Sequence, residues 1–117
     1  MTFEDSIKTV LTKYATFTGR AARPEFWWFA LFGFIVSLIA SFIDAILFGI
    51  DILGTIVGLA LIVPQLAVAT RRLHDIDKSG WWQLLILVPV IGWIVLIYFY
   101  VQPGQASANR FGPPPVA

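Results

Sequence analysis

Apolar residues gather into long runs along this chain, and these runs predict helices that cross a membrane. From Phe26 to Thr70 the sequence is apolar except for Asp44, Asp51 and scattered small or polar side chains. One membrane span needs about 20 residues, so this run is long enough for two helices joined by a tight turn. We expect the two helices over about residues 25–47 and 52–70.

A third apolar run predicts a third span over about residues 81–101. Within it Pro89 and Gly92 predict a kink, because proline removes one backbone hydrogen bond of the helix. Aromatic residues with a polar edge are enriched where a spanning helix meets the membrane surface. The expected interfacial anchors of this kind are Trp27, Trp28, Trp81, Trp82, Tyr98 and Tyr100.

The two ends of the chain predict a surface helix and a flexible tail. Between residues 2 and 15, apolar residues recur every three or four positions, which gathers them on one face of an amphipathic helix. Such a helix lies in the headgroup region of a membrane or packs on the protein's own surface. The segment from 102 to 117 is rich in proline, glycine and small residues, so we expect it to be flexible.

Composition and charge agree with a chain whose main solvent is lipid. Only 13% of the residues are charged, whereas soluble domains average about a quarter. Apart from Arg110, the lysines and arginines precede the first span or lie between the second and the third. Because basic loops stay in the cytoplasm, three spans would place the N-terminus in the cytoplasm and the C-terminus outside. A re-entrant third segment would instead return the tail to the cytoplasm.

Small residues recur along the first two spans and predict close helix packing. In lipid, helices associate through close backbone approach and polar contacts rather than through hydrophobic burial. These residues either pack the two helices of one hairpin together or form the interface of a homo-oligomer. The candidates are Gly33, Ser37, Ser41, Gly54 and Gly58.

Two clusters of charged residues are predicted at one membrane face, and each runs into a tryptophan pair. Together we name them the polar belt, which consists of Arg20, Arg23, Glu25, Arg71, Arg72, His74, Asp75, Asp77 and Lys78. One interpretation is a layer of salt bridges in which Glu25, Asp75 and Asp77 neutralise the cations. Such pairing is expected because unpaired charge is costly where the dielectric constant is low.

The alternative interpretation of the polar belt is a binding site for an anion, an anionic lipid headgroup or a protein partner. Arginine binds phosphate through two parallel hydrogen bonds, and basic pockets between spans bind lipid headgroups on the cytoplasmic side. Under this hypothesis the binding residues are Arg20, Arg23, Arg71, Arg72, His74 and Lys78.

The sequence offers little for catalysis or for a cofactor. It has one histidine and no cysteine, whereas a catalytic metal site needs about three protein ligands. It also lacks a P-loop, a dinucleotide-binding glycine motif, a nucleophile elbow and a zinc-protease motif. A net charge of +1 is too small to favour nucleic acid. We therefore expect no enzyme activity, no metal, no cofactor and no nucleic-acid partner.

A small transporter or channel is the alternative function. Polar and ionisable groups inside a membrane mark transport paths by default, and the candidates here are Asp44, Asp51, Pro64 and Gln65. Both aspartates fall at the predicted outer turn, where we expect water to solvate them. Three spans could form a path only as an oligomer.

Four motifs follow one another along nearly the whole chain: FTGRAARPEFWWF at Phe17–Phe29, RRLHDIDKSGWW at Arg71–Trp82, VPVIG at Val88–Gly92 and NRFG at Asn109–Gly112. In order and spacing they resemble domain-of-unknown-function family 805, a family of small bacterial inner-membrane proteins. The resemblance implies a bacterial cytoplasmic-membrane protein of about three spans, without an established activity. The family tail more often carries an acidic residue before its last proline, where this chain has Pro113–Pro115.

The sequence therefore predicts one integral-membrane domain over residues 1–117. Its fold class is an all-α membrane protein with three transmembrane helices and an N-terminal amphipathic interfacial helix. The predicted function is that of a non-enzymatic structural or interaction protein of the bacterial inner membrane. Membrane lipids and a second copy of the chain are the partners that the pattern favours.

Overall fold

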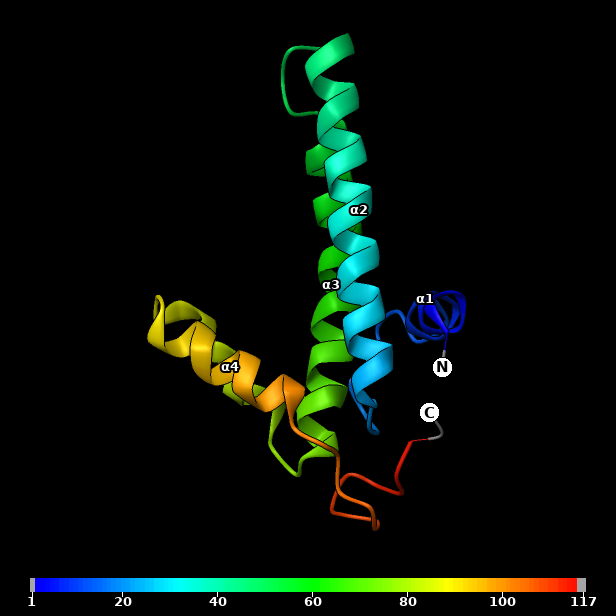
Figure 1. Cartoon of the computed structure of the whole chain (residues 1–117), viewed down its shortest axis with the longest axis vertical. Helices are drawn as coiled ribbons and strands as arrows, with labels where there is room; N and C mark the ends of the chain where they lie inside the picture. The colour runs from blue at the N-terminus through cyan, green and yellow to red at the C-terminus, as the bar shows by residue number, and fades with distance from the viewer. Residues whose placement is uncertain (1, 116–117) are drawn as a thin grey trace.

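A computed structural model describes residues 2–115, and its regular elements in that range are all helical. Two long antiparallel helices, α2 (Arg23–Leu47) and α3 (Leu53–Asp75), form a hairpin that sets the long axis of the molecule (Figure 1). Both are apolar enough to cross a membrane, and at 1.5 Å per residue each exceeds the ~30 Å of a bilayer core. The helices predicted over 25–47 and 52–70 are thus confirmed, and α3 continues to Asp75.

The N-terminal helix α1 (Phe3–Thr12) is shorter than the predicted 2–15 and lies across the hairpin. Its first turn is a capping box, in which the Asp5 N–H donates to Thr2 Oγ1 at 3.1 Å and Thr2 N–H donates back to Asp5 at 3.3 Å. On its inner face Val10 is buried, and the Ser6 hydroxyl donates to the Glu25 carbonyl at 2.6 Å. These contacts pack α1 against the first turns of α2.

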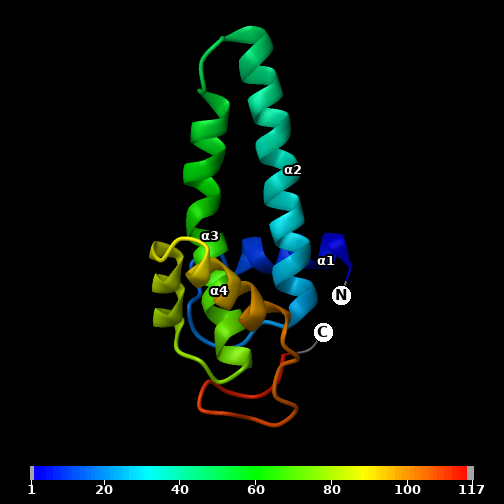
Figure 2. The ribbon, with the colours of Figure 1, turned by 60° about the vertical axis from the view of Figure 1, so that its left-hand side comes forward.

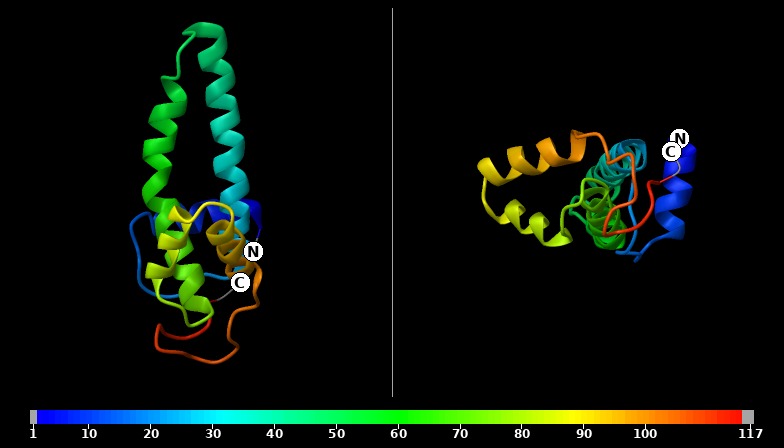
Figure 3. Two further views of the ribbon diagram at one scale, coloured as in Figure 1. Left: turned by 90° about the vertical axis from the view of Figure 1, so that its left-hand side faces the viewer. Right: turned by 90° about the horizontal axis from the view of Figure 1, so that it is seen from below.

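The expected single helix over 81–101 is wrong, because the chain reverses in the middle of that run. A 3₁₀ helix, η1 (Gly80–Leu87), leads into the turn, and α4 (Ile91–Val101) returns beside it (Figure 3). At the turn Val90 has φ 65°, and the Ile91 N–H donates to the Pro89 carbonyl at 2.8 Å, which closes a γ-turn.

Gly92 allows the two arms of this second hairpin to approach closely. A Cβ at position 92 would lie 1.8 Å from the Leu85 carbonyl oxygen. The sequence indicated a kink at Pro89 and Gly92, and the reversal agrees with the alternative of a re-entrant third segment. Each arm is about 16 Å long, roughly half of a bilayer core, so neither arm alone could span it.

Because of this reversal, the described chain begins and ends at the same end of the α2–α3 hairpin (Figure 2). We call this the open end, and the turn between Leu47 and Leu53 the closed end. The view from below shows α1 and the η1–α4 hairpin on opposite sides of the long helices (Figure 3). This placement of the two described ends agrees with the alternative in which a re-entrant third segment returns the tail to the side of the N-terminus.

The predicted small residues divide between the contact of the two long helices and the exposed surface. Gly54 of α3 lies against Asp44 of α2, where an added Cβ would be 3.5 Å from the carboxylate. Gly33 faces α3, where a Cβ would lie 3.0 Å from the Gln65 amide nitrogen. Ser37, Ser41 and Gly58 are exposed. Steps of four residues rotate by about 40° around a helix, so a stripe of period four drifts off the contact face. The buried residues of α2 follow one another at irregular intervals of one to seven residues rather than at a constant four. They are Glu25, Phe26, Phe29, Gly33, Ala40 and Asp44.

Pro64 leaves the Ala60 carbonyl without its usual helical partner, since proline has no backbone N–H. The Tyr14 hydroxyl donates to that carbonyl. This contact joins the loop after α1 to the middle of α3. Gln65, a candidate for a transport path, lies against Gly33 between the two long helices.

Candidate functional site

The charged residues of the polar belt meet at the open end of the hairpin because α3 continues to Asp75. The sequence predicted that this helix ends five residues earlier. Its last turn carries Arg71 and Arg72, both 0% exposed, together with His74 and Asp75. Glu25 lies in the first turn of α2, next to the positive end of that helix dipole. The antiparallel pairing of α2 and α3 therefore brings the two belt segments together.

Asp75 is the centre of the arrangement, since its carboxylate binds two arginines at once. Arg20 Nε lies 2.9 Å from one oxygen, and Arg72 Nη1 lies 2.9 Å from the other. All three side chains are almost completely buried. Charge-assisted hydrogen bonds of this length are roughly twice as strong as neutral ones, so Asp75 ties the loop before α2 to the end of α3.

The remaining nitrogens of Arg20 and Arg72 donate to backbone carbonyls of the C-terminal segment. Arg20 Nη1 reaches the Ser107 carbonyl at 2.9 Å and Nη2 reaches that of Gln105. Arg72 Nε donates to the Tyr100 carbonyl at 3.1 Å, and its Nη2 donates to that of Gln102. The segment that the sequence predicts to be flexible thus supplies four of the nine oxygens of the described chain that accept from these two buried arginines.

Gly104 is the residue that lets this segment lie directly on Asp75. A Cβ at position 104 would lie 1.9 Å from the Asp75 carboxylate, a distance that no side chain can adopt. The Gln105 N–H also donates to the Asp75 carbonyl at 2.9 Å. Sequence reasoning missed Gly104, and the only available signal was the Pro103–Gly104 pair itself.

Arg71 has a separate partner, the carboxylate of Glu25. Its Nε donates to the Thr16 carbonyl at 3.1 Å, whereas its Nη2 is buried without a partner among residues 2–115. The Ala21 N–H donates to the Arg71 carbonyl at 2.9 Å and fixes the loop before α2. The residues of the three buried ion pairs together form what we call the buried ionic cluster, which consists of Arg20, Glu25, Arg71, Arg72 and Asp75.

His74 holds the end of the tail against the last turn of α3. Its Nδ1 lies 2.8 Å from the Gly19 carbonyl oxygen, and its ring stacks on Phe111 with centroids 3.9 Å apart. Asn109 Nδ2 donates to the His74 carbonyl at 3.0 Å. No group of three potential metal ligands occurs in the part of the chain that the structure describes.

Besides His74, three residues of the polar belt stay outside the buried ionic cluster. Arg23 Nη1 donates to the Val101 carbonyl at 3.3 Å. Asp77 pairs with Arg110 of the tail at 3.2 Å rather than with the belt arginines. Lys78 Nζ lies 5.5 Å from the centre of the Trp82 ring, close enough for a cation–π contact.

The aromatic anchors occupy the same end as the belt. The Trp27 indole donates to the Tyr100 carbonyl at 3.2 Å, and the Tyr100 ring lies 4.4 Å from that of Phe26. Tyr98 is exposed on α4. Because α4 runs back toward the belt, Tyr100 lies beside α2 and not at the far surface that a third span would reach.

A third buried carboxylate, after Glu25 and Asp75, lies at the closed end of the hairpin. Asp44 accepts the backbone N–H groups of Leu53 and Gly54, each at 2.8 Å, and so caps the start of α3. We expected water to solvate Asp44, but it is 3% exposed because the short turn folds α3 over it. Asp51 is exposed, as expected.

Chemically, the buried ionic cluster holds segments together and leaves little for a substrate. Every guanidinium nitrogen of Arg20 and Arg72 donates to an oxygen of the chain. Asp75 accepts from both arginines, and Glu25 accepts from Arg71. The salt-bridge interpretation of the belt accounts for these contacts, although Asp77 plays no part in the cluster.

Comparison with known proteins adds a family and two relatives. Residues 14–113 match the family described as "Protein of unknown function (DUF805)". Inner membrane protein YhaH of Escherichia coli (strain K12) is 45% identical over 111 residues, which cover 91% of this chain and 92% of the relative. Inner membrane protein YhaI of the same strain is 46% identical over 109 residues, with 92% of each chain covered. No solved structure matches this one.

Proposed function

Because this chain belongs to the DUF805 family, whose relatives above are inner membrane proteins, we propose that it is a non-enzymatic structural or interaction protein of the bacterial inner membrane. The resemblance of its motifs to that family is confirmed, and the chain is a membrane protein. The observation that carries the proposal is the pairing of Asp75 with both Arg20 and Arg72. A carboxylate that binds an arginine with each of its oxygens has a structural role.

In this proposal the buried ionic cluster is a clamp that holds the C-terminal segment against the ends of both long helices. Burying arginines is costly unless each is paired and hydrogen-bonded. The carbonyls of residues 100–112 meet that requirement for Arg20 and Arg72, so the segment and the cluster stabilise each other. The product is a fixed surface at one membrane face, which is what a structural or interaction protein needs.

The clamp is tested by asking whether anions bind the buried ionic cluster. Purified protein in a neutral detergent is unfolded by heat in increasing inorganic phosphate and, as the control, in chloride of equal ionic strength. We expect the two midpoints to move together, because Arg20 and Arg72 have their acceptors within the chain. A midpoint that rises in phosphate alone would assign the cluster as an anion site instead.

We propose that the open end faces the cytoplasm and that both termini lie there. None of the eight lysine and arginine residues falls between positions 24 and 70, which form most of the hairpin and all of its closed end. Basic segments stay on the cytoplasmic side. The chain would then cross the membrane twice, while the η1–α4 hairpin enters and leaves the cytoplasmic leaflet.

A compartment-sensitive reporter fused after Ala117 tests this topology. Two spans with a re-entrant hairpin predict that the reporter is active in the cytoplasm, as is the same reporter fused before Met1. Activity outside the cytoplasm for the C-terminal fusion alone would restore the three-span topology. The closed end, labelled through an introduced cysteine at Ile50, should react from the outer side only.

A second copy of the chain is the protein partner that we propose. Ser37, Ser41 and Gly58 are exposed on the hairpin, and small residues on a lipid-facing surface let another helix approach closely. The chain has no cysteine, so Ser41→Cys alone should form a crosslinked dimer in native membranes under a mild oxidant. Ile39→Cys, on the other side of α2, is the matched control. Monomer from both variants would remove the oligomer.

A further inference from the structure

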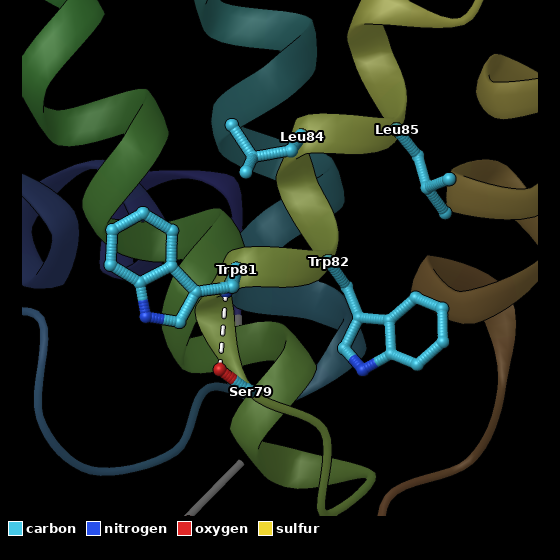
Figure 4. Close-up of a pocket in the computed structure, with 5 residues that line it drawn as sticks. All are labelled: Ser79, Trp81, Trp82, Leu84 and Leu85. Atoms are coloured by element: carbon cyan, nitrogen blue, oxygen red, sulfur yellow. Dashed lines mark hydrogen bonds between the residues drawn. The ribbon is translucent and has the colours of Figure 1, made fainter.

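Two adjoining hollows lie where α3 ends and η1 begins, outside the buried ionic cluster. The first has a volume of about 430 Å³, and its walls include Phe17, His74 and Gln83. The second, of about 370 Å³, lies on η1 between Trp81 and Trp82, with Leu84 and Leu85 above them (Figure 4). Ser79 and Trp81 line both, so the hollows share a wall.

The first hollow presents hydrogen-bond acceptors. The Gly19 carbonyl can only accept, so Nδ1 of His74 carries the proton, and Nε2 of the neutral ring is an acceptor without a partner among residues 2–115. The Gln83 amide nitrogen donates to the Gly80 carbonyl at 3.3 Å, which fixes the amide orientation. The Gln83 carbonyl oxygen accepts no hydrogen bond from the described residues, and it is the second acceptor.

Aromatic side chains complete the first hollow, and no lysine, arginine or carboxylate lines it. Phe17 is 43% exposed and Trp81 is 78% exposed, so their ring faces are accessible. Ring faces attract cations, and they do so best where water is partly excluded. Acceptors combined with aromatic faces suit a small cation with N–H donors, that is, a primary ammonium group.

Lys78 lies beside the hollows in the chain and offers a partner for an anion. Its ammonium group rests over the rings of Trp82 and Phe99 at 5.5 and 5.4 Å. No carboxylate of the described chain lies within ion-pair distance of it, unlike Arg110, which pairs with Asp77. The start of η1 therefore offers three features: the first hollow with its acceptors, the ammonium group of Lys78, unpaired in the described chain, and the apolar second hollow.

We propose that this site binds an aminophospholipid with an ethanolamine headgroup. The ammonium group enters the first hollow, the phosphate lies beside Lys78, and an acyl chain follows the groove between Trp81 and Trp82. The assignment rests on the proposed function in one respect, because η1 must lie in a lipid leaflet. It extends that function by naming the lipid class that the protein selects.

The direct test is native mass spectrometry of the full chain with an equimolar mixture of three lipids with identical acyl chains. These are phosphatidylethanolamine, phosphatidylcholine and phosphatidylglycerol. Choline has no N–H donor, so we expect about five- to tenfold more bound phosphatidylethanolamine than phosphatidylcholine. Equal binding of these two lipids, or a preference for phosphatidylglycerol, would overturn the assignment.

Variants at Gln83 locate the preference. Gln83→Leu removes one of the two free acceptors and should lower the ratio of ethanolamine to choline lipid to about two, with His74 Nε2 as the remaining acceptor. Gln83→Glu keeps an acceptor in the same place and should retain the preference, which also guards against a folding defect in the leucine variant. Gln102→Leu is the matched control, because its side chain lies outside both hollows. A preference that is as large in Gln83→Leu as in the unmodified chain would refute the site.

Soluble glycerophosphoethanolamine separates a lipid site from a site for a free amine. We expect millimolar amounts to leave lipid binding unchanged, because the soluble compound lacks the acyl chain that fills the groove. Full displacement would assign the first hollow to a free amine and not to a lipid. The clamp is read separately, from protection of the C-terminal segment against protease, which Gln83→Leu should not alter.

Discussion

The closed end of the long hairpin buries Asp44, the open end buries Asp75 beside Glu25, and the two aspartates are satisfied in opposite ways. Asp44 and Asp75 are both 3% exposed. Asp44 accepts backbone N–H groups nine and ten residues further along the chain. Asp75 accepts from Arg72 nearby and from Arg20, which is 55 residues away, under a lid formed by the tail. The closed end is therefore local, whereas the open end depends on nearly the whole chain.

This difference teaches that burial alone does not say what a carboxylate is worth to the fold. A helix cap contributes about 0.5–2 kcal/mol. A buried charge whose partner is removed costs about 3–5 kcal/mol, because the remaining charge has no compensation. Changes at the open end should therefore have larger effects, and they should release the C-terminal segment as well.

The largest effect is expected from Asp75→Asn. The substitution preserves shape but leaves Arg20 and Arg72 without an anion, so we expect a loss of about 3–5 kcal/mol in the free energy of unfolding. Denaturation in detergent measures this loss. Limited proteolysis should cleave within the C-terminal segment that follows Val101. A loss below about 1 kcal/mol in the free energy of unfolding, with an uncleaved tail, would mean that the carboxylate at the open end contributes no more to stability than a helix cap does.

Gly104→Ala sharpens the comparison by leaving every charge in place. Its methyl group would collide with the Asp75 carboxylate, so we expect about 1–3 kcal/mol of destabilisation from overpacking and a protease-sensitive tail. Gly58→Ala is the control, since a Cβ there meets nothing within 4 Å. Equal stability of the two alanine variants would show that the tail does not rest on Asp75.

Asp44→Ala is expected to cost less, about 0.5–2 kcal/mol, because it removes a helix cap but strands no opposite charge. Asp44→Asn retains an acceptor oxygen and should cost less still. The same unfolding measurement applies, and the C-terminal segment should stay protected in both variants. A tail released by Asp44→Ala would show that the two ends are coupled.

The smallest effect concerns Asp5, a carboxylate that caps a helix without burial. Hydrogen bonds from the Thr2 backbone and side chain hold the pKa of Asp5 below its ordinary value. A lowered pKa in the folded state means that this cap stabilises α1 above the ordinary pKa and loses that contribution as the pH falls through the lowered one. NMR titration of α1 amides should follow this loss. A midpoint at or above the ordinary pKa would contradict it.

Local patterns were enough to predict much of this fold. Hydropathy predicts α2 and α3, and the Thr2–Asp5 capping box follows from residue types three positions apart. Such features depend on neighbours in sequence, so one sequence contains the information. The belt as a layer of ion pairs was one of two interpretations, and Arg71–Glu25 and Arg72–Asp75 agree with it.

The features that the sequence did not predict depend on contacts with backbone groups far away in the sequence. Residue types do not indicate which backbone groups these are. Arg20 and Arg72 bind carbonyl oxygens of the tail, and every residue has a carbonyl, so no pattern distinguishes the ones that they use. The reversal at Val90 requires a γ-turn that valine disfavours. Gly104 looks like an ordinary loop glycine until its distance to Asp75 is known.

The contacts between the tail and the arginines also set an order of events during synthesis. Arg20 and Arg72 are synthesised before the carbonyls of residues 100–112 that accept from them. Until then the open end holds cations without their final acceptors. A chain that stops before residue 100 cannot close that end, so closure of the open end reports that this segment has been synthesised.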